Sequence, residues 1–513
     1  MHNIIIIINY MNLSEEQKIA FQKFKKGKNI VITGPGGTGK SKLIKHLVYH
    51  ARLDKKKVQV TALTGCAAIL LGTAAKTIHS WSGIRLGKGA KLDVVKQAMK
   101  NKKSRNAWKS TQILIIDEAS MMSMKIFDIL NTLGQTARNN IEPFGGMQIV
   151  MVGDFYQLPP IETYSEPETG MFCFESQDYF KIFPKENHIV LKKIFRQTDL
   201  EYIKILNEIR EGELSEESKE TLKPYLKRNY DPNEHNGSIL TKLFPIRARV
   251  DAMNKALFEE LPDVAKNYDS SITRNNAVYL ETGKAIESER LVECYGLSKM
   301  EIDMEIQNLV SSTPCVEKLQ LKLGAAVMCN ANIALEHGIC NGSQGTIIDF
   351  VGEHPKVKFV NGCVMVMDLH HWQSEQYPTI SISQFPLQLA WALTIHKIQG
   401  TTLKMAQIDV GKDIFAYGQT YVALSRIQSL DGLYMSSFMP DRVKADPRVK
   451  GFYKHIETVK HTLEPEPESH LEVESIESSS NVKRGNEIPN ITTKSMFAQF
   501  ACDSNVKIIK LDS

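Results

Sequence analysis

The 513-residue sequence lacks long apolar runs, paired cysteines and a strong excess of charge. The run IIIII at 4–8 is too short to span a membrane, and no basic segment precedes it. The eight cysteines are scattered without a C-x-x-C pair, which argues against a zinc site or a disulfide framework. The net charge is only +5, which neither requires nor excludes a polyanionic partner. These absences predict an intracellular, soluble protein, and its 42% hydrophobic residues can bury more than one core.

What the sequence does contain is a regular alternation of short apolar runs with helical segments over its first 195 residues. The runs NIVITG, KVQVTALT, QILIID and MQIVMVGD are typical of strands buried on both faces of a parallel sheet. A second α/β set is predicted from SILTKLFP, from LQLAWALTIHKIQG and from 405–440. Short alternating strands with Asn-Gly turns lie between, at about 270–385, and predict an inserted β-barrel. From 461 onward the chain is rich in Glu, Pro and Ser, which predicts disorder.

The segment GPGGTGKS, 34–41, fits the pattern G-x-x-x-x-G-K-[ST] between a predicted strand and a predicted helix. Its glycines allow backbone N–H groups to point at phosphate oxygens, and the helix N-terminus adds positive charge. Lys40 is expected to reach the β- and γ-phosphates, and Ser41 is expected to bind Mg²⁺. The residues of this loop predicted to bind a nucleoside triphosphate are Gly34, Gly36, Gly37, Thr38, Gly39, Lys40 and Ser41.

The segment QILIIDEAS, 112–120, carries two adjacent carboxylates at the end of a predicted buried strand. Asp117 is expected to hold the Mg²⁺, and Glu118 to orient and deprotonate the attacking water. An acidic start of a helix is the alternative, because carboxylates are also favourable there. The phosphate-binding pattern some 75 residues earlier favours catalysis.

The segment GDFYQLPP, 153–160, follows another predicted strand of the same sheet, so it is expected at the same edge. Gln157 is neutral and suits sensing of a γ-phosphate. Two prolines fix the backbone beyond it. The rings of Phe155 and Tyr156 have two alternatives, contact with a nucleic-acid base or packing under the sheet.

With GPGGTGKS, DEASMM and GDFYQLPP in this order, the chain resembles the superfamily-one DNA helicases. It is most similar to the petite-integration-frequency (PIF-type) branch, the relatives of RecD. Further segments that resemble motifs of this family are LSEEQ, TALTGCAA, KTIHSWSGI, LQLAWALTIHKIQGTTL and YVALSRIQSLDGLY. The resemblance covers about 12–440. It departs from the family pattern at Ile398, where a small residue is commoner, and over 128–142.

The resemblance implies an α/β fold of two RecA-like P-loop domains, with a small wedge insert, an SH3-like β-barrel insert and a disordered C-terminal tail. The expected boundaries are an N-terminal extension at 1–11, a first domain at 12–195 with its wedge at about 84–110, a second domain at 196–269 and 386–460, the barrel at 270–385 and the tail at 461–513.

The resemblance also implies roles that spacing does not give. Arg196 and Arg426 match arginines that reach the γ-phosphate from the second domain, Gln17 matches an adenine reader, and Gln399 and Gly400 would link the nucleotide to the DNA-binding face. Trp81 has two alternatives, stacking on a base at the duplex fork or packing in a core. The predicted DNA contacts are Thr64, His79, Trp81, Phe155, His396 and Thr401.

The activity that follows is an ATP-dependent 5′-to-3′ DNA helicase acting in replication, repair or recombination, with ATP and Mg²⁺ as cofactors. The expected partners are single-stranded DNA and duplex or forked DNA, with no membrane; a monomer is expected, and the tail is a candidate site for a protein partner. The alternatives are an ATP-switched DNA-binding or recombination-mediator protein, or a translocase that does not unwind. The residues do not distinguish a nucleus, a mitochondrion, a bacterial cytoplasm and a virus-infected cell.

Overall fold

The computed structural model describes most of the chain between residues 13 and 459. The described ranges are 13–71, 75–231, 240–274, 288–331, 333–339, 341–374 and 377–459, together with 508–509. The predicted extension at 1–11 and all of the predicted disordered tail except Ile508–Ile509 lie outside these ranges.

A six-stranded sheet with the order β3-β2-β4-β5-β1-β6 forms the first part of the structure, and all of its pairs are parallel. Its strands are β1 (Ile30–Thr33), β2 (Val58–Ala62), β3 (Lys76–Thr77), β4 (Ile113–Asp117), β5 (Gln148–Gly153) and β6 (His188–Val190). The accompanying helices are α2 (Glu15–Lys25), α3 (Lys40–Leu53), α4 (Gly65–Leu71), α5 (Ile78–Ser82), α6 (Lys91–Lys100), α7 (Lys102–Ser110), α8 (Met124–Arg138) and α9 (Tyr179–Ile182). The four strands predicted here, β1, β2, β4 and β5, are confirmed.

The apolar runs of this sheet are explained by burial on both faces. Along β4, Ile113 and Ile115 belong to one hydrophobic core, whereas Leu114 and Ile116 belong to another. Successive side chains of a strand point to opposite faces, so a strand that is covered on both sides must be apolar throughout.

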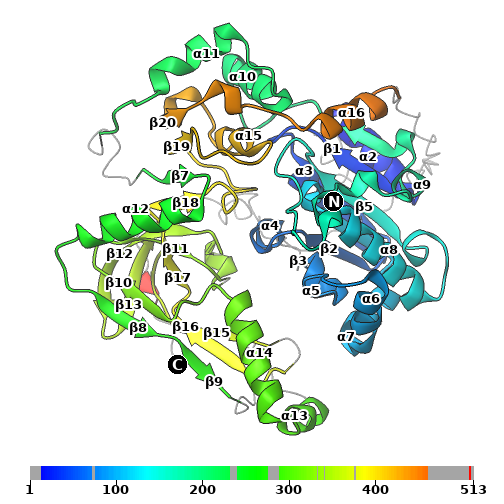
Figure 1. The fold of residues 1–513 in the computed structure, drawn as a ribbon, viewed down its shortest axis with the longest axis horizontal. Coiled ribbons are helices and arrows are strands. Elements are labelled where there is room, and N and C mark those ends of the chain that lie inside the picture. Colours follow the sequence, from blue (N-terminus) through cyan, green and yellow to red (C-terminus); the bar gives the residue numbers. More distant parts are fainter. Residues whose placement is uncertain are drawn as a thin grey trace, which may run out of the picture.

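A second, four-stranded sheet has the order β18-β7-β19-β20, and it too is wholly parallel. Its strands are β7 (Lys242–Phe244), β18 (Ala392–Thr394), β19 (Ala406–Val410) and β20 (Leu433–Phe438). Its helices are α10 (Leu200–Glu211), α11 (Glu216–Leu222), α12 (Arg247–Glu259) and α15 (Gln419–Leu424). We call the elements around the first and second sheets the first and second parallel units; Figure 1 shows them as the blue-to-cyan part and the upper part with β19 and β20.

Antiparallel strands occupy the segment between β7 and β18, as predicted for the insert. They are β8 (Lys266–Asp269), β9 (Ser271–Thr273), β10 (Lys318–Leu321), β11 (Ala326–Cys329), β12 (Gln344–Val351), β13 (His354–Phe359), β14 (Val364–Val366), β15 (His370–Gln373), β16 (Ser381–Gln384) and β17 (Leu387–Leu389), and β21 (Ile508–Ile509) pairs with β14 in parallel. The helices α13 (Ser288–Tyr295) and α14 (Lys299–Ser312) in this segment were not predicted.

The run LQLAWALTIHKIQG corrects one prediction. Only its second half, β18, joins the second parallel sheet, while β17 pairs with β11 in the antiparallel sheet. Both halves are apolar, so periodicity could not separate them.

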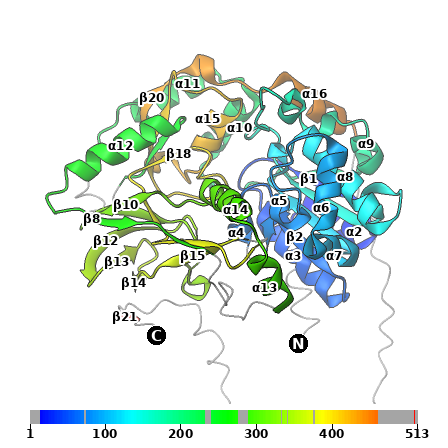
Figure 2. The same cartoon turned by 60° about the horizontal axis from the view of Figure 1, so that its bottom comes forward.

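The last described helix, α16 (Pro447–Ile456), crosses from the second unit back to the first. It follows β20 in the chain, yet Val449, Phe452, Tyr453 and Ile456 are buried in the core that α8 and β4 share. Figures 1 and 2 both show it, in orange, beside the elements of the first unit. The two parallel units are therefore joined by a helix buried in the first as well as by the chain that enters α10.

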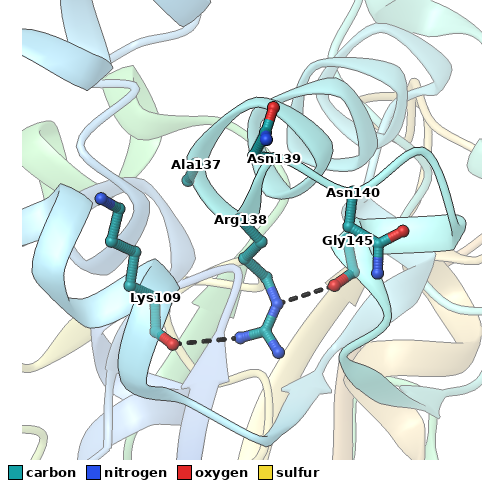
Figure 3. Close-up of a pocket in the computed structure, with 6 residues that line it drawn as sticks. All are labelled: Lys109, Ala137, Arg138, Asn139, Asn140 and Gly145. Carbon is teal, nitrogen blue, oxygen red and sulfur yellow. Dashed lines mark hydrogen bonds between the residues drawn. The ribbon is translucent and has the colours of Figure 1, made fainter.

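The predicted wedge region consists of α6 and α7, which are attached to α8. The Arg138 guanidinium donates hydrogen bonds to the carbonyl oxygens of Gly145 (2.7 Å), Trp108 (3.1 Å) and Thr111 (2.9 Å). Figure 3 shows Arg138 between α7 and the turn at Gly145. Arg138 therefore satisfies carbonyl groups left open at the end of α7.

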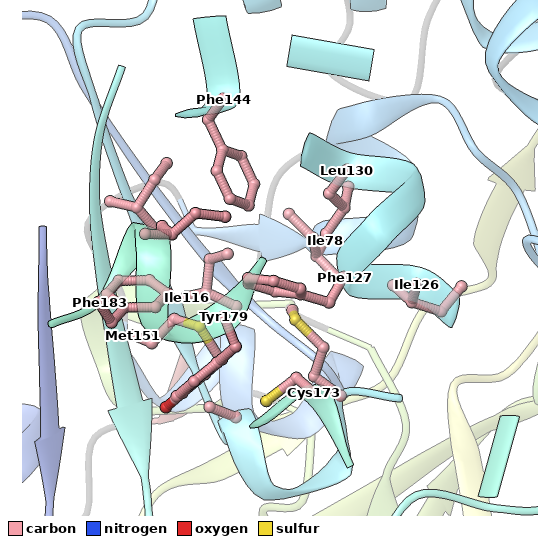
Figure 4. Packing of buried hydrophobic residues seen from close by; sticks show 14 of the residues in the cluster. Ile78, Ile116, Ile126, Phe127, Leu130, Phe144, Met151, Cys173, Tyr179 and Phe183 are labelled. Atoms are coloured by element: carbon pink, nitrogen blue, oxygen red, sulfur yellow. The ribbon is translucent and has the colours of Figure 1, made fainter. Parts of the chain in front are cut away.

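The first unit has a dense aromatic core on the α8 side of its sheet. Phe127, Phe144, Tyr179 and Phe183 have no exposed surface, and Figure 4 shows them converging with Met151 and Cys173. The predicted α/β fold class, with an insert of antiparallel sheets, is confirmed.

Replacing Trp108 by Ala should lower the free energy of unfolding by about 3–5 kcal/mol, because a fully buried indole leaves a cavity. Urea unfolding measures this. Leu92→Ala on the neighbouring helix, at a side chain that is 61% exposed, is the control and should change stability by less than about 0.5 kcal/mol. Equal effects of the two substitutions would contradict the packing described here.

Candidate nucleotide site

The phosphate-binding pattern forms a loop between β1 and α3. Gly37 and Gly39 have φ values of 86° and 79°, which favour glycine, and a Cβ atom on Gly37 would lie 2.6 Å from the Cβ of Arg196. Gly39 is the N-cap of α3 and provides no side-chain cap, and the first turn contains no acidic residue. The helix N-terminus is therefore left with donors for an anion.

Lys40 points back into this loop. Its Nζ donates to the carbonyl oxygens of Gly34 (2.7 Å) and Pro35 (2.9 Å). Burial lowers the pKa of Lys40, while the charges of Asp154, Glu118 and Asp117 oppose that change. An ammonium group held by neutral carbonyls is poised for an anionic ligand.

The two predicted carboxylates lie at the carboxyl end of β4. Burial, and then the neighbouring charge of Glu118, raises the pKa of Asp117 to about 7. Glu118 has left-handed backbone angles (φ 55°, ψ 41°), a strained conformation for a residue with a side chain, which costs about 1–3 kcal/mol. Its Oε2 accepts a hydrogen bond from Gln399 Nε2 at 3.0 Å, so a residue of the second unit touches the acidic pair directly.

Two arginines from the second unit face the phosphate-binding loop. A Cβ atom on Gly36 would lie 3.6 Å from both Arg196 Nη1 and Arg426 Nη2. Among the described residues, neither guanidinium forms an ion pair: Arg196 donates to Ser425 O (3.0 Å), and Arg426 donates to Val422 O (2.9 Å) and Ser425 Oγ (2.8 Å). Burial, and then the charge of Arg426, lowers the pKa of Arg196 to about 10.

The remaining predicted nucleotide residues lie around the same loop. Gln17 is buried, donates from Nε2 to Thr38 O (3.2 Å) and accepts from Ser14 N at Oε1 (3.1 Å), so its amide also closes the capping box of α2. Ser41 is exposed at the start of α3. Gln157 and Gln399 each have a buried Oε1 without a hydrogen-bond partner among the described residues. Gly400 follows Gln399 with a φ of 83°.

Four of the predicted DNA contacts follow the carboxyl ends of parallel strands. Thr64 and His79 follow β2 and β3, while His396 and Thr401 follow β18. Each threonine hydroxyl has a local partner, Ala67 N for Thr64 (3.2 Å) and Ile398 O for Thr401 (2.7 Å). Burial lowers the pKa of both His79 and His396, which favours the neutral imidazole.

The prediction that Trp81 and Phe155 contact DNA is corrected. Trp81 is 5% exposed and packs against Trp108 with ring centroids 4.6 Å apart. Phe155 is 1% exposed and lies edge-on to Phe174 and Phe452. Both aromatic side chains belong to the core of the first unit. Of the two alternatives for each ring, packing is therefore the one that the structure shows.

Sequence reasoning missed three residues at this site. Phe195 is 49% exposed, and a Cβ on Gly39 would lie 3.6 Å from its ring and 3.0 Å from Gln17 Nε2. Tyr421 accepts a hydrogen bond from Gly36 N at 2.8 Å, and Asp154 is fully buried beside Arg210. The acid in GDFYQLPP was a signal for Asp154; Phe195 and Tyr421 carry no local signal.

The donor set fits a polyphosphate bound with a hard divalent cation. The Tyr421 oxygen already occupies a Gly36 N–H donor that a phosphate oxygen could take. Lys40, Arg196 and Arg426 supply positive charge without ion pairs in the described structure, and Ser41, Asp117 and Glu118 supply oxygen ligands of the kind Mg²⁺ prefers.

Among the described residues, no helix combines the length and the apolar character that a membrane span requires.

The raised pKa of Asp117 predicts a pH-dependent stability in the absence of nucleotide and Mg²⁺. The folded chain binds this proton up to about pH 7, whereas the ordinary pKa of an aspartate is 3.8. The stabilisation is therefore fully present below about pH 4 and falls as the pH rises to 7. Asp117→Asn should abolish that slope and exceed wild-type stability at pH 8 by up to about 4 kcal/mol.

Urea unfolding at pH 4.5 and pH 8 checks this, with Asp93→Asn at an exposed position of α6 as the control. Parallel pH profiles for wild type and Asp117→Asn would contradict it.

Comparison with known proteins places this arrangement in a family. The protein-family model described as PIF1-like helicase matches residues 12–220. A second family model, described as DNA helicase Pif1, 2B domain, matches residues 306–350. The chain is 34% identical over 458 residues to the ATP-dependent DNA helicase PIF1 of Danio rerio, covering 88% of this chain. It spans 65% of the length of that relative.

Solved structures agree along nearly their whole length. The crystal structure of Pif1 helicase from Candida albicans superposes with a TM-score of 0.73 at 32% identity, covering 86% of this chain and 99% of that one. The Bacteroides Pif1 helicase in complex with ADP-AlF3 and ssDNA gives a TM-score of 0.64 at 27% identity, covering 87% and 97%. The chain therefore belongs to the PIF1-like helicase family.

Proposed function

We propose that this protein is an ATP-dependent DNA helicase that moves 5′ to 3′ on single-stranded DNA and unwinds duplex DNA. The observation that carries the proposal is the charge arrangement between the two parallel units. Three cations without ion pairs among the described residues surround the phosphate-binding loop, and the charges of two adjacent carboxylates, Asp117 and Glu118, act on Lys40. An ATP-hydrolysing site between two units that can move apart is what a translocating motor requires.

Within this proposal each side chain has a chemical task. Lys40 and the loop amides hold the β- and γ-phosphates, and Glu118 orients and deprotonates the attacking water. Arg196 and Arg426 stabilise the charge that develops on the γ-phosphate, which is worth roughly 10³ to 10⁵ in rate for such arginines. Gln157 senses the γ-phosphate with its free buried oxygen, and Gln17 reads the adenine.

Ser41 and Asp117 would hold Mg²⁺, which supplies neutralisation of phosphate charge. This role is compatible with the raised pKa of Asp117, because a nearby dication favours the charged carboxylate.

Gln399 and Gly400 couple this chemistry to the strand-binding face. Gln399 contacts Glu118 and lies three residues from His396 in the same loop. With ATP bound, contacts between the γ-phosphate and the two arginines hold the two parallel units together. When hydrolysis removes the γ-phosphate, these contacts are lost, and the population shifts toward an arrangement in which the units lie farther apart. Binding of DNA next to His396 can shift Gln399 and so release Glu118 for the water.

For DNA we propose Thr64, His79, His396 and Thr401 as contacts to the sugar-phosphate backbone, which makes binding independent of sequence and sensitive to salt. The solved Bacteroides relative in complex with ssDNA supports this choice of ligand. Duplex and forked DNA are the proposed unwinding substrates, in replication, repair or recombination.

We assign the domains as two RecA-like units, 12–195 and 196–269 with 386–460, with the wedge at about 84–110 and the barrel at 270–385. The protein is proposed to act as a monomer inside the cell, with the segment from 461 onward available for a protein partner.

Strand displacement with ATP and Mg²⁺ tests the proposal, on one duplex with a 5′ tail and one with a 3′ tail. Wild type should open only the 5′-tailed duplex and show DNA-stimulated ATP hydrolysis. Lys40→Ala should lower kcat by at least about 10²-fold, because a preorganised charge at the phosphates is removed. Lys45→Ala, on the exposed face of α3, should behave as wild type.

The outcomes separate the alternatives. ATP hydrolysis that rises with DNA while neither duplex opens would identify a translocase or a DNA-binding switch. Hydrolysis unchanged in Lys40→Ala would overturn the assignment of the site, and opening of the 3′-tailed duplex would overturn the polarity.

A further inference from the structure

A buried ion pair joins the two parallel units next to the phosphate-binding loop. Asp154 directly follows β5 and has no exposed surface. The Arg210 guanidinium donates to it from Nη2 to Oδ1 (2.8 Å) and from Nε to both carboxylate oxygens (3.2 Å each). Arg210 is the penultimate residue of α10, whose Tyr202, Ile205, Leu206 and Ile209 belong to the core of the second unit.

Tyr453 of α16 completes this cluster. Its hydroxyl donates to Asp154 Oδ1 (3.2 Å), lies 2.5 Å from Thr33 Oγ1 and accepts from Phe155 N (3.3 Å). Thr33 is the last residue of β1, immediately before Gly34 of the phosphate-binding loop. Arg210 also lies over the rings of Tyr156 (4.4 Å) and Tyr453 (5.1 Å), which are stacked on each other.

The cluster is connected to both arginines that face the loop. Helix α10 begins four residues after Arg196, and Tyr202 on its first turn donates to Leu424 O (2.8 Å), two residues before Arg426. Helix α10 is therefore anchored at Asp154 by Arg210. The segment that contains Arg196 leads into this helix, and the segment that contains Arg426 contacts it. A shift of α10 would move both guanidinium groups relative to Gly36.

The chemistry of the Asp154–Arg210 pair indicates that its main effect is to fix the geometry of the groups it joins, not to raise the free energy of unfolding. Burial alone would raise the pKa of Asp154, but the charge and hydrogen bonds of Arg210 outweigh it and hold that pKa below its ordinary value. A buried ion pair is weak evidence for stability because its desolvation cost offsets its attraction. Its bidentate fork, however, tolerates little change of distance or angle, so it fixes how the end of α10 lies against the end of β5.

We propose that Asp154, Arg210 and Tyr453 are positioning residues that set the register of the phosphate-binding loop against Arg196 and Arg426, and so give the site its preference for a nucleotide with a γ-phosphate. This rests on the proposed function only in that Arg196 and Arg426 contact the γ-phosphate. ADP lacks that group, so ADP affinity does not depend on the register.

Tyr453→Phe and Arg210→Lys test the proposal, because the first removes one hydroxyl and the second keeps the charge but loses the fork. Calorimetric affinities for ATPγS and for ADP, each with Mg²⁺, are compared with the ATPase kcat. Both variants should bind ATPγS about tenfold more weakly and lower kcat about tenfold, which corresponds to about 1.4 kcal/mol, the range of one hydrogen bond. The ADP affinity should stay within about twofold of wild type.

Tyr179→Phe is the matched control. Tyr179 is also buried in the same core, but its hydroxyl lies 3.3 Å from His188 Nε2, and no hydrogen bond to Thr33 or Asp154 is formed by it among the described residues. It should keep the wild-type ratio of ATPγS to ADP affinity.

Wild-type affinity ratios in both variants would overturn the proposal. So would an equal loss of ATPγS and ADP affinity, or the same change in Tyr179→Phe, since either indicates a general structural effect. The ratio of ATPγS to ADP affinity can be measured without ATP hydrolysis. A wild-type chain that binds ATPγS but does not hydrolyse ATP would therefore refute the proposed function, while the affinity comparison would still test the role of these three residues.

Discussion

Positive charge that has no direct ion-pair partner among the described residues is the constraint on which this structure depends. Lys40, Arg196 and Arg426 surround one loop and, within the described residues, are held only by carbonyl and hydroxyl oxygens. Removing charge from water is costly, and a protein keeps such groups where an anionic ligand supplies the missing partner. Arg196 lies in the segment before α10 and Arg426 follows α15, so the placement of these two helices brings both guanidinium groups to Gly36.

The two units meet this constraint from opposite sides. The first unit supplies the loop, the helix N-terminus and the acidic pair, all at the carboxyl ends of parallel strands, where ligands bind in open α/β sheets. The second supplies Arg196, Arg426 and Gln399, and α16 returns from it to be buried in the first. The strained backbone at Glu118 fits the same picture, because strain persists where surrounding contacts hold a functional group in place.

Much of this could be predicted from the sequence. Local signals were sufficient for β1, β2, β4 and β5 and for the loop at 34–41, because burial on both faces and phosphate binding each impose a pattern within a few residues. The placement of β17 failed, since an apolar run does not reveal which sheet it pairs with, and the rings of Trp81 and Phe155 proved to be packed in a core. Tyr421, Phe195 and Tyr453 could not be found, because their contacts join residues far apart in the chain.

The most direct measurement of the central claim is the distance between spin labels on the two parallel units, at Lys45 on α3 and Lys255 on α12. Both positions are exposed and lie on regular helices. The account predicts that ATPγS with Mg²⁺ shortens and narrows the distance distribution relative to ADP, because only the γ-phosphate supplies the partner for Arg196 and Arg426. Identical distributions with ATPγS and ADP would contradict it.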